Sequence, residues 1–445
     1  MLVEFQVGNF RSFKEIATFS LVAANLSAKD KELDQNTVFA ADEQLSLLKS
    51  AVIYGANASG KSNLISALRF MRHLVINSSR ESQIDDPIDV EPFRLSEEMT
   101  DKPSFFQIVF YVMQRRYRYG FTVNRERIVS EWLYHVPTSR EAKLFERDTE
   151  GIHPASTFKE GREALVALTR GNALFLSVLA QFNGEVSQKI VGWFRELNVS
   201  SGLDDTSYRK YTIQNLGISR YREQIIDFVR KLDLGIHDIT VEGVDSAPVN
   251  TLHESFGANS VILQKTTYRK SDGRLYGGTV YSLSGESVRT MHRKYDSEGQ
   301  PTDWEEFDMD QNESEGTKKL FSFAGPIIDT LRNGKILVVD ELDARLHPLM
   351  TRAIIALFNS VETNPHHAQL LFTTHDTNLL SNKVFRRDQI WFTEKDRKGA
   401  THLYSLAEFK VRNDASYEKD YIAGRYGALP YIGELAHLVS ESSGE

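Results

Sequence analysis

The sequence predicts an α/β fold, and three strand-like segments carry that prediction. An apolar segment, SAVIYG (50–55), leads into a glycine-rich loop and then into a segment with apolar residues at a helical period. Two later apolar segments, 336–339 and 370–373, are each followed directly by polar residues. Strands that deliver polar side chains at their ends are typical of sheets that bind ligands at that edge.

The composition is that of an ordinary soluble globular protein. The chain of 445 residues is long enough for two or three domains, with 41% hydrophobic and 26% charged residues. It has no cysteine, which excludes disulfides, thiolate metal sites and cysteine nucleophiles. Neither a signal-peptide pattern nor an apolar run of about 18 residues occurs, so we expect a cytoplasmic protein without membrane spans. The net charge of −8 excludes a uniformly basic surface but permits a local basic groove.

The remaining elements follow in order along the chain. Two strands are expected within 1–19, and three antiparallel strands within 105–136. Residues 160–233 have a helical pattern without a sustained heptad, which favours compact helices over a coiled-coil arm. Strand-like pieces follow within 238–307, and a second α/β stretch begins near Ser314. Three regions are therefore expected, and their limits are 1–150, 151–236 and 237–445.

The glycine-rich loop has the sequence GANASGKS (55–62), a complete G-x-x-x-x-G-K-S motif. Its backbone N–H groups and the following helix N-terminus are suited to wrap phosphates, Lys61 to neutralise them and the Ser62 hydroxyl to bind Mg²⁺. A chance glycine-rich turn would lack the strand–loop–helix context found here. The expected nucleotide-binding residues of this segment are Asn57, Gly60, Lys61, Ser62 and Asn63.

Two strand ends supply candidate catalytic groups. The segment GKILVVDELDARLHP places Asp340 and Glu341 after an apolar strand, and LLFTTHD places His375 after another. Asp340 is expected in the Mg²⁺ shell, Glu341 beside the attacking water and His375 at the γ-phosphate. Alone, an acidic pair here also suits a turn or helix cap, and a single histidine more often makes a local hydrogen bond. Their order after the phosphate loop favours the catalytic interpretation.

The segment NESEGTKKLF (312–321) predicts a second anion site. Ser314 and Gly316 precede a helical pattern, and a serine with free N–H groups at a helix start binds anions. One triphosphate seldom needs two such sites in one chain. We therefore expect this one to face a nucleotide held by another chain; a plain helix N-cap is the alternative.

Together, these four motifs resemble those of ABC-type ATPases of the SMC/RecF/OLD branch, and within it the RloA-like AAA family ATP-binding proteins of anti-phage defence clusters. The resemblance implies an ABC-type P-loop ATPase head, with a mixed sheet core and an antiparallel β-lobe, plus an inserted compact helical lobe. ATP and Mg²⁺ are the implied cofactors. The resemblance covers nearly the whole chain and includes NFRSF (9–13), EPFRL (91–95), SEWLY (130–134), DQIWFTEKD (388–396) and GRYGALP (424–430).

The resemblance also implies that ATP is sandwiched between two head-to-tail chains. Ser314 and Gly316 of one chain would then face the nucleotide held by Lys61 of the other. Asp343 would cross the interface, and Arg11 matches a position where this branch often has a basic residue near the nucleotide. For Arg11, a surface charge in a turn remains an equal alternative.

Some positions depart from the family pattern. The signature is Glu-Ser-Glu-Gly, which suits SMC-like heads better than transporter subunits. The glutamine that this class places near the site is either Gln83 or Gln107. Arg345 stands where a small polar residue is usual, and either contacts the second chain or points to solvent.

The implied function is an ATP-hydrolysing switch, homodimeric through its heads, that regulates a separate effector in a bacterial defence system. Lys61 and Ser314 are 253 residues apart (314 − 61), and the short insertion between them favours a docking lobe over DNA-entrapping arms. The chain lacks a recognisable nuclease, so an RloB-like or other nuclease or toxin is the expected partner. A RecF-like DNA-binding ATPase of DNA repair is the alternative. Nucleic acid remains a possible partner because two clusters combine cations with tyrosines, although a solvated strand face explains them at least as well: Arg115, Arg116 and Arg118, and Arg269, Lys270 and Arg274.

Overall fold

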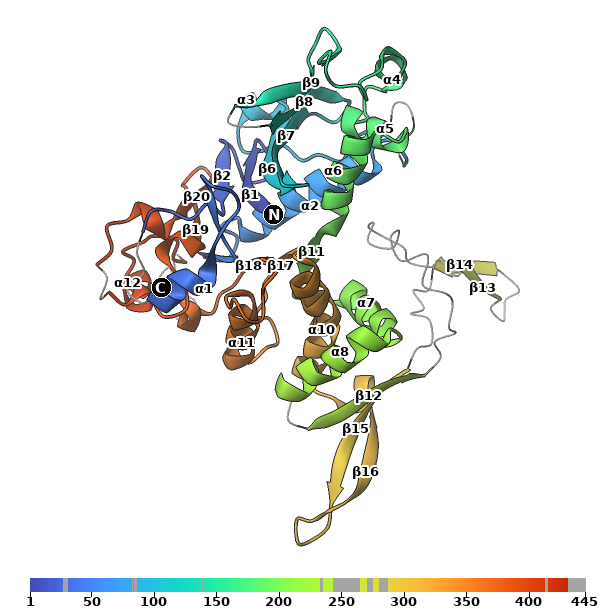
Figure 1. The fold of residues 1–445 in the computed structure, drawn as a ribbon, viewed down its shortest axis with the longest axis vertical. Helices are drawn as coiled ribbons and strands as arrows, with labels where there is room; N and C mark the ends of the chain where they lie inside the picture. The colour runs from blue at the N-terminus through green and yellow to red at the C-terminus, as the bar shows by residue number, and fades with distance from the viewer. Residues whose placement is uncertain are drawn as a thin grey trace, which may run out of the picture.

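The structure is a computed structural model, and it describes residues 1–26, 31–81, 83, 86–137, 140–232, 235–242, 265–269, 275–279, 287–412 and 415–430. For β13 (Lys265–Arg269) and β14 (Leu275–Thr279) it describes the backbone pairing alone. Figure 1 shows two large sheets with helices between and around them, and a hairpin that projects from one end.

One large sheet is antiparallel and has the strand order β10-β9-β8-β7-β6-β1-β2. Buried residues alternate with partly exposed ones along much of β6, as expected where one face of a sheet packs on a core. A two-residue turn joins β6 to β7, as the sequence predicts. The strands are β1 (Leu2–Gly8), β2 (Ala17–Ser20), β6 (Ser104–Val112), β7 (Arg115–Val123), β8 (Ile128–Val136), β9 (Ala142–Arg147) and β10 (Ile152–Pro154).

The second large sheet carries the predicted motifs and has the strand order β11-β17-β18-β5-β19-β20. Its neighbours pair in parallel except at β19–β20, which is antiparallel. The two sheets together are the predicted fold class, a mixed sheet core beside an antiparallel lobe. The strands are β5 (Ser50–Gly55), β11 (Leu197–Ser201), β17 (Ile336–Asp340), β18 (Gln369–Thr373), β19 (Ile390–Lys395) and β20 (Thr401–Ser405).

Helix α2 (Lys61–Asn77) lies between the two sheets, and its buried side chains share one apolar core with strands of both. The opposite face of the mixed sheet packs against α10 (Glu315–Asn333), α11 (Pro348–Phe358) and α12 (Tyr417–Ile422). Successive residues of β5 and β17 therefore point into two different cores. This explains why both segments are continuously apolar, as strands covered on both faces must be.

A strand divides the helical block that the sequence predicts over 160–233. Helices α4 (Glu163–Leu168), α5 (Phe175–Gln181) and α6 (Glu185–Glu196) precede β11, while α7 (Thr206–Leu216) and α8 (Ser219–Leu232) follow it and pack on α10. The interpretation as helices alone was wrong at β11, which pairs with β17 so that Ser201 lies opposite Asp340. The sequence LNVSS is too short to display a strand period. The region limits at 150 and 236 remain predictions.

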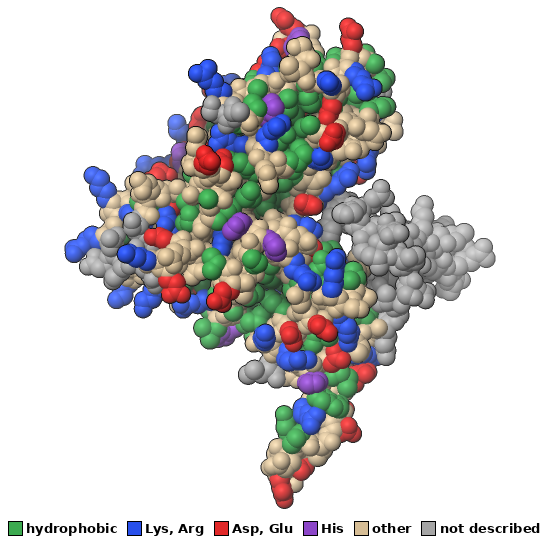
Figure 2. Space-filling view, viewed as in Figure 1, with side chains coloured by type: hydrophobic (Ala, Val, Ile, Leu, Met, Phe, Trp, Pro, Cys, Tyr) green, Lys and Arg blue, Asp and Glu red, His purple; other side chains and the backbone are tan. Residues whose placement is uncertain are grey.

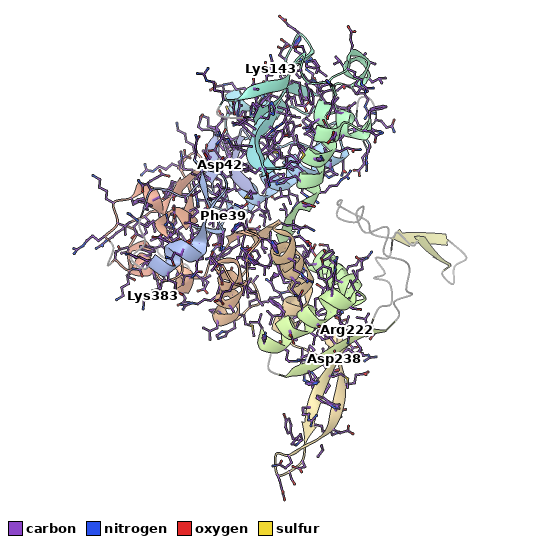
Figure 3. All side chains as sticks on the ribbon, in the orientation of Figure 1. Phe39, Asp42, Lys143, Arg222, Asp238 and Lys383 are labelled. Atoms are coloured by element: carbon purple, nitrogen blue, oxygen red, sulfur yellow. The ribbon has the colours of Figure 1, made fainter. Side chains whose placement is uncertain are left out.

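After α8, three strands form a small antiparallel sheet: β12 (Ile236–Glu242), β15 (Ser287–Tyr295) and β16 (Pro301–Asp308). Arg222 of α8 and Asp238 of β12 point toward each other and form an ion pair of 3.0 Å (Figure 3). The β15–β16 hairpin projects from the molecule, and α9 (Met309–Asn312) leads from it to α10. Part of the strand-like sequence within 238–307 lies outside the described residues.

Smaller elements complete the described chain: α1 (Lys31–Thr37), β3 (Val38–Ala40), β4 (Ser46–Leu48) and α3 (Glu97–Thr100). The ring of Phe39, in β3, stacks on His367 at 4.6 Å between ring centres. Among the described residues, no helix is both long and apolar enough to cross a membrane.

Candidate nucleotide-binding site

The loop between β5 and α2 is fixed by hydroxyl groups from β19 and β20. The Ser59 and Thr393 hydroxyl oxygens are 2.6 Å apart, and the Thr401 hydroxyl donates to the carbonyl oxygen of Ser59 at 2.8 Å. A Cβ atom at Gly55 would lie 2.5 Å from the Ser59 hydroxyl and from two oxygens of Thr393, so only glycine fits there. The loop is therefore held in shape by strands distant in sequence.

Lys61, the first residue of α2, is only 5% exposed. Its Nζ atom donates to the carbonyl oxygens of Gly55 and Ala56, at 2.9 and 3.1 Å. Burial lowers the pKa of the lysine, and three nearby carboxylates at the end of β17 oppose that shift. Because the neighbouring Ser62 and Asn57 are exposed, the lysine lies at the base of an open polar surface.

The ends of β17 and β18 meet at Thr373. Its hydroxyl donates to Asp340 Oδ1 at 2.7 Å and accepts from the backbone N–H of Glu341 at 2.7 Å. Glu341 has a φ of 57°, a left-handed conformation that turns the chain directly after the strand. Thr373 thus orients both members of the acidic pair. The sequence interpretation missed this residue, although its place at the end of the TT-H strand was a usable signal.

His375 and Asp343 lie close to the acidic pair and to Lys61. The backbone N–H of His375 donates to Asp343 Oδ2 at 3.4 Å. Asp343 Oδ1 is buried and has no hydrogen-bond partner within the described part of the chain. Burial and then the positive charge of Lys61 lower the pKa of His375, and the carboxylate of Asp343 opposes this. The structure therefore brings Lys61, the acidic residues after β17 and His375 into one electrostatic unit.

The loop after β1 packs against the start of α2. Asn63 Nδ2 donates to the Ser12 hydroxyl at 2.7 Å, and the Thr401 N–H donates to the Ser12 carbonyl at 2.7 Å. Arg11 is exposed, and its side chain forms an ion pair of 3.2 Å with Glu91. This contact agrees with the surface-charge alternative for Arg11; a contact with the nucleotide stays a prediction.

The predicted second anion site lies at the start of α10. Ser314 is exposed and caps its own helix, accepting a hydrogen bond from the Thr317 N–H at 3.1 Å. A Cβ atom on Gly316 would lie 3.3 Å from the Arg345 carbonyl oxygen. The Arg345 side chain also pairs with Glu315 at 3.2 Å, so it contacts its own signature segment. The described contacts of this site are thus with the turn after β17.

Gln107 is engaged within the antiparallel sheet. Its Oε1 accepts from Arg118 and from the Trp132 indole, both at 3.0 Å, and its amide nitrogen donates to Gln6 at 3.0 Å. To contact a ligand through its side-chain amide, Gln107 would have to give up these bonds. Gln83, the other candidate, is exposed.

One cation of the first basic cluster, Arg118, is paired with a carboxylate. Arg118 donates two hydrogen bonds to Glu141, at 2.9 and 2.8 Å, and its guanidinium lies 4.3 Å from the centre of the Tyr134 ring. In the second cluster, the side chain of Arg269 is not described, and Lys270 and Arg274 lie outside the described residues. Figure 2 shows acidic and basic side chains interspersed over the described part of the face in view.

The chain matches a known family of domains. A family model described as "AAA domain, putative AbiEii toxin, Type IV TA system" (AAA_21) matches residues 50–381, from β5 to beyond His375. No curated protein is significantly similar to the chain.

Three solved structures are similar at low identity. The SMC head domain from Thermotoga maritima has 12% identity and a TM-score of 0.38, with 91% of this chain and 98% of that chain covered. An SmcHead bound to the C-winged helix domain of ScpA has 14% identity and a TM-score of 0.39, covering 91% and 97%. An Smc head domain with an extended coiled coil, bound to the C-terminal domain of ScpA derived from Pyrococcus furiosus, has 13% identity and a TM-score of 0.38, covering 95% and 98%. Because the family model spans most of the chain, including the phosphate loop and the acidic strand end, this protein belongs to the AAA_21 family of AAA domains.

Proposed function

We propose that the chain is an ATP-hydrolysing switch of the ABC/SMC-like kind, with each ATP held between two head-to-tail copies. One observation carries the proposal. The loop lysine, the acidic pair and His375 lie in one electrostatic unit, whereas the second anion site at Ser314 is exposed and capped only onto its own helix start. A second copy would bring its Ser314 to the nucleotide of the first.

The residues around Lys61 fit Mg-ATP. The glycine-only cradle at Gly55 leaves room for phosphates close to the backbone. Oxygen ligands on Ser62 and Asp340 suit Mg²⁺, which would neutralise charge on the phosphates when bound.

Each remaining residue then has a distinct role. Lys61 and the loop N–H groups bind and orient the phosphates, with Asn57 within the loop and Asn63 just after it. Glu341 accepts the proton of the attacking water. The other residues supply positioning and charge stabilisation, which phosphoryl transfer needs more than covalent help. Neutral His375 donates a hydrogen bond to the γ-phosphate. Ser314, Gly316 and Asp343 of the partner copy complete the site.

The ATP cycle would control a separate effector, a nuclease or toxin, in a cytoplasmic anti-phage system. The family description names a putative AbiEii toxin of a type IV toxin–antitoxin system, and because such systems have two components it supports a search for a partner protein. The RecF-like alternative requires strong, salt-sensitive and ATP-dependent binding of duplex DNA by the isolated chain. The pairing of Arg118 with Glu141 removes one cation from such a surface.

Mixing two inactive variants tests the shared site. Lys61→Ala and Ser314→Arg chains should each fail to hydrolyse ATP alone. In an equimolar mixture, half of the dimers contain one intact site of two, so about a quarter of the wild-type rate should return. A mixture that stays inactive, while size-exclusion chromatography shows the two chains paired, would refute the shared site.

A further inference from the structure

Lys319 lies on α10, five positions after Ser314, and is only 1% exposed. Its amino group donates to the carbonyl oxygen of Gly202 at 2.9 Å and also to the carbonyl oxygen of Ala344. It lies 5.3 Å from the centre of the Phe323 ring. A buried lysine is costly unless its charge is satisfied, so a cation that holds two backbone segments calls for an explanation.

Both acceptors flank the turn that carries the acidic pair. Gly202 follows β11, and its N–H donates to the carbonyl oxygen of Asp340 at 2.5 Å. No side chain fits at Gly202, because a Cβ atom there would overlap the carbonyl oxygen of Glu341. Ala344 closes the same turn, with its N–H donating to the Glu341 carbonyl at 3.1 Å. Lys319 therefore contacts the turn from both sides.

The turn needs such support because Glu341 adopts a left-handed φ of 57°. A residue other than glycine in this conformation costs about 1 kcal/mol or more and persists only where neighbours hold it. The start of α10 does not need the lysine for the same purpose, since the Ser314 hydroxyl already caps that helix.

We infer that Lys319 is a positioning residue that ties the signature helix α10, the end of β11 and the turn after β17 into one unit. Its bonds make the placement of Glu341 depend on the placement of α10. This inference rests on the proposed function, and within it a closing partner that engages Ser314 would also set the geometry of Glu341 in the same chain. The strand β11 and the helices on either side of it would be coupled to the site by the same contact.

Charged groups from each packed element face the lysine. They are Asp205 after β11, Glu341, Asp343 and Arg345 in the turn, and none of them forms a close ion pair with Lys319 among the described contacts. Burial lowers the lysine pKa to about 8; Asp205 and Asp343 oppose this, and Arg345 adds to it. The ammonium form therefore predominates at neutral pH and is lost above pH 8.

The test replaces Lys319 with methionine, which keeps the length and removes the donors. We expect kcat for ATP hydrolysis to fall at least tenfold, with the Kd for ATP within about threefold of wild type, since Lys61 and its loop are untouched. Lys319→Arg keeps a cation with several donors and should recover most of the rate, with its alkaline limb moved above that of the wild type. Lys335→Met is the matched control: it removes a 2.9 Å lysine bond to Asp329 at the other end of α10 and should change neither constant.

A second readout separates this inference from the proposed function. Without nucleotide, amide hydrogen exchange within 202–204 and 341–345 should be faster in Lys319→Met than in the wild type or Lys335→Met. If the wild type proves unable to hydrolyse ATP, the proposed function fails and this exchange pattern still tests the lysine. Unchanged exchange in these segments, an unchanged kcat, or a loss of ATP binding equal to the loss of rate would overturn the inference.

Discussion

The phosphate loop and the start of α10 contain the same kinds of residue, but different contacts hold them in place. Each combines a glycine and a hydroxyl at a helix N-terminus. In the loop, Ser59 is 3% exposed and is fixed by threonines of β19 and β20. At α10, Ser314 is exposed and bonds to its own first turn. The loop is thus fixed by distant strands, whereas the predicted anion site at the start of α10 is open at the surface.

This difference shows that the phosphate loop is held rigidly and the start of α10 is not held in the same way. A preformed cradle binds its ligand without an ordering cost, whereas an exposed helix start is free to accept a ligand from another molecule. The predictions below probe the two sides of this contrast, beginning with the largest expected effect.

Glu341→Gln should lower ATP turnover by on the order of 1,000-fold, because it removes the proposed general base. Binding of ATP should persist, since the loop and Lys61 are unchanged. Steady-state hydrolysis and equilibrium ATP binding measure the two effects, and ATP-dependent dimers should accumulate in the variant. Normal turnover would remove Glu341 from the role of base.

Gly55→Ala should weaken ATP binding by about 100-fold, since the new methyl group lies 2.5 Å from three oxygens and must open the loop. The melting temperature should also fall. Gly192→Ala is the control, because a Cβ atom at Gly192 meets nothing within 4 Å and alanine favours the helix by up to about 1 kcal/mol. Gly316→Ala should leave the fold nearly as stable as the wild type, as its Cβ contact of 3.3 Å is milder. If Gly55→Ala and Gly316→Ala destabilised the fold equally, the loop and the start of α10 would not differ in how tightly they are held.

Thr373→Val should lower kcat by about tenfold while the protein stays folded, because a part-buried N–H and a part-buried carboxylate each lose a partner at about 1–3 kcal/mol. The substituted side chain has nearly the same shape. Thr351→Val, in α11, is the matched control, since the buried Thr351 hydroxyl has no hydrogen-bond partner in the part of the chain that is described. If both variants kept full activity, Thr373 would not orient the acidic pair.

The smallest effect concerns the titration of His375. Burial and Lys61 lower its pKa below the usual 6.5, so the imidazole is neutral at pH 7. As pH falls below 6.5, the unfolded chain takes up this proton before the folded one, and folding stability declines. NMR titration of the ring should give a midpoint below 6.5 without nucleotide and a higher one with bound phosphates. A midpoint above 6.5 in the free protein would contradict the described site.

Sequence reasoning located the parts of the site that one segment can specify. The loop before Lys61, the acid after β17 and His375 after β18 each follow an apolar strand, so position along the chain predicts position at the sheet edge. Thr373 was missed although it stands at the end of a predicted strand, and Lys319 was missed because its role arises from contacts with segments far along the chain, which no local pattern encodes. Strand β11 was missed for the same reason: its identity comes from pairing with β17 rather than from its own period.

The order of strands in the mixed sheet also bears on how the protein is made. Strand β5 ends at residue 55, but its neighbours β18 and β19 begin at 369 and 390. At about 5–20 residues per second, the ribosome needs roughly 15–60 s to extend the chain from residue 55 to residue 369, a further 314 residues (369 − 55). Throughout that interval an apolar strand has neither of its final partners, which favours recruitment of chaperones and exposes unfinished chains to aggregation. The edge of the sheet that carries the candidate site can therefore be assembled only after β18 and β19 have been synthesised.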